Sequence, residues 1–112
     1  MSFDQLGQVL GATDEPPTML VLNACDSLGG ADVVLPTTPV VIGMKSDISD
    51  LASSVFAARF YAAIASGQSV RSAMAQGSLA VDLSDLREGW KPDSVVRAGI
   101  ELGELILVQP VT

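Results

Sequence analysis

The sequence predicts a small α/β fold, a mostly parallel sheet flanked by helices. Two short apolar runs, residues 19–22 and 40–44, are each followed at once by polar residues. Such runs are typical of buried parallel strands, and the helical periodicity between residues 49 and 81 supplies helices to cover them. The chain has 112 residues, of which 48% are apolar, enough to build a core. We therefore expect residues 1–112 to form a single domain.

The remaining elements follow from spacing and breakers. Apolar residues three and four apart predict a helix over residues 2–12. Residues 33–35 predict either a short strand or a helical turn. A long helix is expected over residues 49–66, and a second helix is expected after Ser69. The tail over residues 95–108 predicts the last strand, which is firmest at its apolar end.

A sheet of three or four strands leaves edges that need covering. We therefore expect something else to complete the sheet. The partner would be a protein, either the remainder of the same protein or a separate chain. Homo-oligomerisation is one form that this completion could take.

Charge and residue usage exclude several function classes. The net charge is −7, and the six basic residues are scattered, which argues against binding to nucleic acid or to a membrane. The sequence contains no histidine. This absence excludes the catalytic dyads and triads in which a histidine activates a serine or a cysteine, and it also excludes most catalytic zinc sites. We expect no metal and no cofactor. A single cysteine, with no signal peptide, favours the reducing cytoplasm.

Polar residues follow both predicted parallel strands. Cys25, the only cysteine, comes after the first strand, and residues 45–47 come after the second. The carboxyl ends of neighbouring parallel strands meet at one sheet edge, where open α/β sheets bind ligands. A thiol at this edge is well placed for a nucleophile. A cysteine buried simply as a small apolar residue fits the position as well, and the polar residues around it suit a turn.

An ordered set of motifs resembles a known family. The run LVLNACDS at residues 20–27 precedes VVIGMKSDISDLASSVFAARFYAAIASGQSVRSAM at residues 40–74. In order, these contain a strand ending in Asn-Ala-Cys, a strand ending in Gly-Met, an acidic helix start, and a Phe-Tyr helix closed by glycine. This pattern, which covers residues 19–81, resembles the C-terminal half of CHAT domains. CHAT domains are relatives of caspases and separases in the caspase-like cysteine peptidase clan.

The resemblance implies roles for individual residues. Cys25 would be the catalytic nucleophile that forms an acyl-enzyme, and its backbone N–H would belong to the oxyanion hole. Asn23 would line the primary specificity pocket. The resemblance places four more residues in substrate binding: Asp26 and Ser27 beneath the substrate, and Ser46 with its neighbours Lys45 and Asp47 in a further pocket wall.

The resemblance also shows what is missing. In this clan the catalytic histidine lies upstream, in a His-Gly loop one strand before the cysteine, and this sequence has no histidine. We therefore expect a partial caspase-like fold, inactive alone, that a missing segment or a partner completes for peptide-bond hydrolysis. Two alternatives stay open: a non-catalytic interaction or oligomerisation module, and a small-molecule binder.

Overall fold

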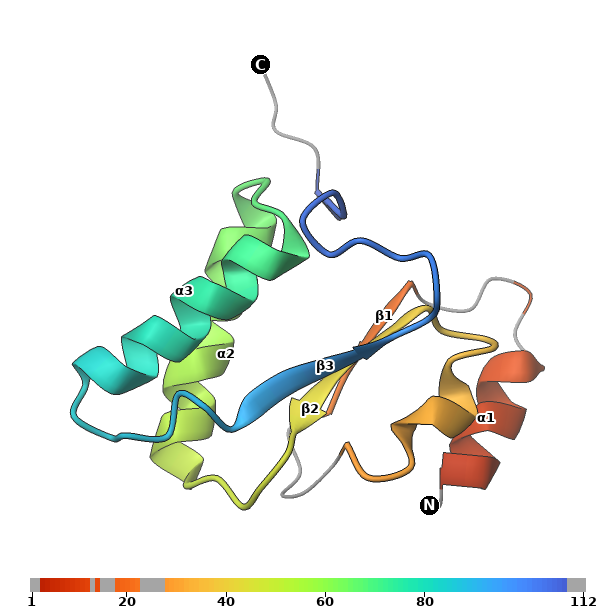
Figure 1. The fold of residues 1–112 in the computed structure, drawn as a ribbon, viewed down its shortest axis with the longest axis horizontal. Coiled ribbons are helices and arrows are strands. Elements are labelled where there is room, and N and C mark those ends of the chain that lie inside the picture. The colour runs from red at the N-terminus through yellow and green to blue at the C-terminus, as the bar shows by residue number, and fades with distance from the viewer. Residues whose placement is uncertain (1–2, 13, 15–17, 23–27, 109–112) are drawn as a thin grey trace. The chain divides into compact units, whose positions relative to one another are not determined.

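The computed structural model describes residues 3–12, 14, 18–22 and 28–108 and confirms the predicted small α/β fold (Figure 1). The described residues form two compact units. A sheet unit takes its residues from 1–47 and 93–100, and a helical unit from 48–92 and 101–112. In chain order the elements are α1 (Phe3–Gly11), β1 (Met19–Val21), the 3-10 helix η1 (Ala31–Val34), β2 (Val40–Met44), α2 (Asp50–Ala65), α3 (Val70–Leu83) and β3 (Pro92–Val96).

The sheet is mixed, with β2 between β1 and β3. β1 and β2 run parallel, with Met19 opposite Val40 in register. β3 runs antiparallel to β2. Its carboxyl end lies at the start of β2, where the Arg97 N–H donates to the Pro39 carbonyl at 2.8 Å. The chain directions in Figure 1 agree.

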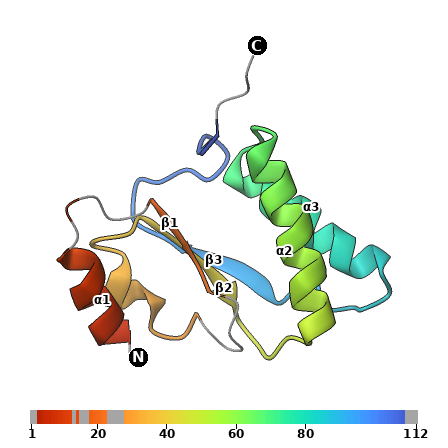
Figure 2. The same ribbon diagram turned by 180° about the vertical axis from the view of Figure 1, so that it is seen from behind.

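The core of the sheet unit lies between the sheet and the short helices α1 and η1, which share one face (Figure 2). Leu10 of α1, Val34 of η1 and Val41 of β2 are buried together there. All five residues of β2 are buried, whereas those of β1 are only partly buried. β2 is therefore the central strand, as its unbroken apolar sequence predicts.

The helical unit is a hairpin of α2 and α3, and each helix starts at a serine cap. The Ser49 hydroxyl accepts from the Ala52 N–H, and the Ser69 hydroxyl accepts from the Ser72 N–H, both at 3.1 Å. The helices approach closely at Gly77, where a Cβ atom would lie 2.7 Å from the Phe56 ring. Both helices thus begin where the sequence predicts, because the caps are local signals.

The predicted last strand, residues 95–108, is right only at Val95 and Val96 and wrong over the rest of its length. Strand β3 lies at Pro92–Val96, and the apolar residues 105–108 contribute only an isolated bridge between Ile106 and Ser69. The segment before this bridge serves another purpose, since the Leu105 carbonyl accepts from the Val70 N–H at 2.9 Å. That bond satisfies one of the donors that the start of α3 leaves open. The ambiguous residues 33–35 mostly join η1 as a helical turn.

Thr37 and Thr38, just before β2, offer a matched pair of substitutions. Thr38 is fully buried, and its hydroxyl has no hydrogen-bond partner among the described residues. An unpaired buried hydroxyl is costly, so Thr38→Val should raise the free energy of unfolding by about 1 kcal/mol.

Thr37 is the control, because its hydroxyl donates to the Val34 carbonyl at 3.0 Å. That carbonyl also accepts the N–H groups of both threonines, so Thr37→Val should cost only about 0.5 kcal/mol. Urea unfolding of the two variants measures both changes. A Thr38→Val variant that is less stable than the parent chain would contradict the inference that the Thr38 hydroxyl is unpaired.

Candidate functional site

Two hydrogen bonds bring the residues on either side of segment 23–27 to the end of β2. The Leu22 N–H donates to the Ile42 carbonyl at 2.7 Å, and the Leu28 N–H donates to the Met44 carbonyl at 3.3 Å. Because β1 and β2 are parallel, their carboxyl ends lie at the same edge of the sheet. We call this edge, with residues 22, 28 and 45–47, the carboxyl edge.

The structure places part of the predicted site at the carboxyl edge. Residues 45–47 follow β2 there; Lys45 and Asp47 are exposed, and Ser46 is half-buried. The other predicted site residues lie outside the described residues: Asn23, Cys25, Asp26 and Ser27. The geometry therefore fixes the flanks of the cysteine segment and the polar residues beside them.

Asp93 is a residue at this edge that the sequence analysis missed. Its carboxylate lies 3.8 Å from the Lys45 ammonium, and the two side chains are 51% and 46% exposed. An exposed pair of this kind contributes little to stability, about 0–1 kcal/mol. Nothing local marks Asp93, because the contact arises from the antiparallel pairing of β3 with β2. A lysine beside an aspartate gives this edge both signs of charge.

A second polar cluster joins the start of α2 to the loop after α3. Both oxygens of the Glu88 carboxylate accept from Ser49, one from its N–H at 2.9 Å and one from its hydroxyl at 2.6 Å. Lys91 donates to the same carboxylate at 2.9 Å. The Ser49 hydroxyl and N–H, together with Lys91, lower the pKa of Glu88 to about 2.

A perturbed pKa often marks a functional site, but this cluster has a structural explanation. Every donor to Glu88 lies at the N-cap of α2 or in the loop that carries Glu88 itself. The carboxylate also sits at the positive end of the α2 helix dipole, where a negative charge is stabilising. We therefore assign Glu88 to holding the helical unit together.

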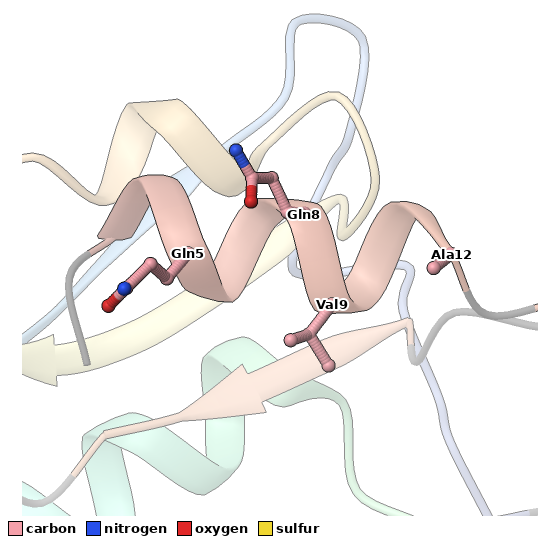
Figure 3. Close-up of a pocket in the computed structure, with 4 residues that line it drawn as sticks. All are labelled: Gln5, Gln8, Val9 and Ala12. Atoms are coloured by element: carbon pink, nitrogen blue, oxygen red, sulfur yellow. The ribbon is translucent and has the colours of Figure 1, made fainter.

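A shallow surface pocket lies along one side of α1 (Figure 3). Gln5, Gln8, Val9 and Ala12 line it. The described lining offers two amides and apolar surface, from α1 and the residue that follows it. The described residues that line the pocket carry no nucleophile and no general base.

The part of the chain that the structure describes shows neither a metal site nor a membrane span. No group of three histidine, cysteine, aspartate or glutamate side chains within it is arranged to hold a metal ion. Among the helices described, none is both long enough and apolar enough to cross a bilayer.

No protein-family model matches the chain, and no curated protein is significantly similar to it. The resemblance to CHAT domains therefore stays a prediction from the motifs at residues 19–81. The part of the structure that can be compared with this prediction is the carboxyl edge.

Replacement of Glu88 by glutamine tests the polar cluster. The pKa of Glu88 is lowered from 4.5 to about 2, so its ionised form stabilises the fold above pH 4.5. This contribution is lost as the pH falls from 4.5 towards 2, because the carboxylate then becomes protonated. Glu88→Gln should lower the free energy of unfolding at pH 7 and flatten its decline over that acidic range.

The matched control is Glu104→Gln, at an exposed glutamate in the same unit. It should leave the stability at pH 7 nearly unchanged. Urea unfolding followed by circular dichroism at several pH values measures the free energy of unfolding of both variants. Equal behaviour of the two variants would contradict the role of Glu88.

Proposed function

We propose that this chain carries the nucleophile half of a caspase-like cysteine peptidase domain of the CHAT type. The histidine base would come from polypeptide outside these 112 residues. The observation that supports the proposal most is the parallel pairing of β1 with β2. This pairing brings both flanks of the Cys25 segment and residues 45–47 to one sheet edge, the arrangement that the resemblance requires.

The proposed reaction is hydrolysis of a peptide bond in two steps. The base takes the proton of the Cys25 thiol, and the thiolate attacks the scissile carbonyl carbon to form a carbon–sulfur bond. The carbon–nitrogen bond then breaks, and the amine leaves with a proton from the base. Water, activated by the same base, hydrolyses the thioester, which releases the carboxylic acid and restores the thiol.

The other residues would bind the substrate. The backbone N–H of Cys25 would stabilise the oxyanion, and Asn23 would line the primary pocket. Asp26 and Ser27 would lie beneath the substrate. Residues 45–47 would form a further wall, with the Lys45–Asp93 pair at its side. A thiol nucleophile works in a reducing compartment, so we assign the protein to the cytoplasm.

The chain alone lacks the group that would activate the thiol. A cysteine with the ordinary pKa of about 8.5 is only a few per cent thiolate at neutral pH. The 112 residues contain no histidine, which is the side chain whose ordinary pKa lies nearest to pH 7 and the base that the resemblance calls for. We therefore expect this chain by itself to hydrolyse no peptide.

Labelling of the thiol tests this expectation, since Cys25 is the only cysteine. The rate of reaction with iodoacetamide should rise with pH and reach half its maximum near the ordinary pKa of about 8.5. Cys25→Ala is the control, which must take up no label. Fast labelling at pH 6 would contradict the claim that the chain lacks activation.

The completing segment can be sought directly in the encoding genome. Sequence upstream of residue 1, or a neighbouring reading frame, should encode a strand that ends in His-Gly. Mixing that polypeptide with this chain should give cleavage of a peptide library, and the mixture with Cys25→Ala should give none. Absence of such a segment from both places would sink the proposal.

A further inference from the structure

We draw no further inference here: the strongest candidate, the exposed apolar face of α3 that carries Leu79 and Leu83, supports no proposal, because nothing among the described residues shows what covers it.

Discussion

The hydrogen-bonded ladder between β1 and β2 is the constraint on which the candidate site depends. It sets Met19 opposite Val40 and Val21 opposite Ile42, and this register brings Leu22 to the end of β2. A slip of one residue would turn the side chains of β1 to the opposite face and remove Leu20 from the core below α1 and η1. The core therefore fixes the register, and the register fixes which polar segments share the carboxyl edge.

Much of the fold follows from local signals in the sequence. The serine caps and apolar periodicity define α2 and α3, and the five-residue apolar run defines β2. β3 is the exception, because Pro-Asp-Ser is a poor strand sequence on its own. Its placement is supported by Arg97, whose guanidinium donates to the Leu35 and Pro36 carbonyls at 2.9 Å. Contacts between residues some sixty positions apart leave no pattern in one sequence.

The candidate site, like the fold, could be predicted only in part from the sequence. The position of residues 45–47 after β2 follows from the parallel strands alone. The ion pair between Asp93 and Lys45 and the hydrogen bonds from Ser49 to Glu88 could not be predicted from the sequence. Each contact joins residues about forty or more positions apart. The sequence therefore predicts which sheet edge carries the candidate site. The charged residues that lie beside this edge are known only from the folded structure.

The central claim is that the residues on both sides of segment 23–27, Leu22 and Leu28, lie at the carboxyl end of β2. A nitroxide label on Cys25, the only cysteine, tests this directly by paramagnetic broadening of amide resonances. The strand is about 17 Å long, so its two ends are readily distinguished. Strong broadening at residues 45–47 with little effect at residues 37–40 is the predicted result. Strong broadening at residues 37–40 instead, with residues 45–47 unaffected, would contradict the parallel arrangement and the site built on it.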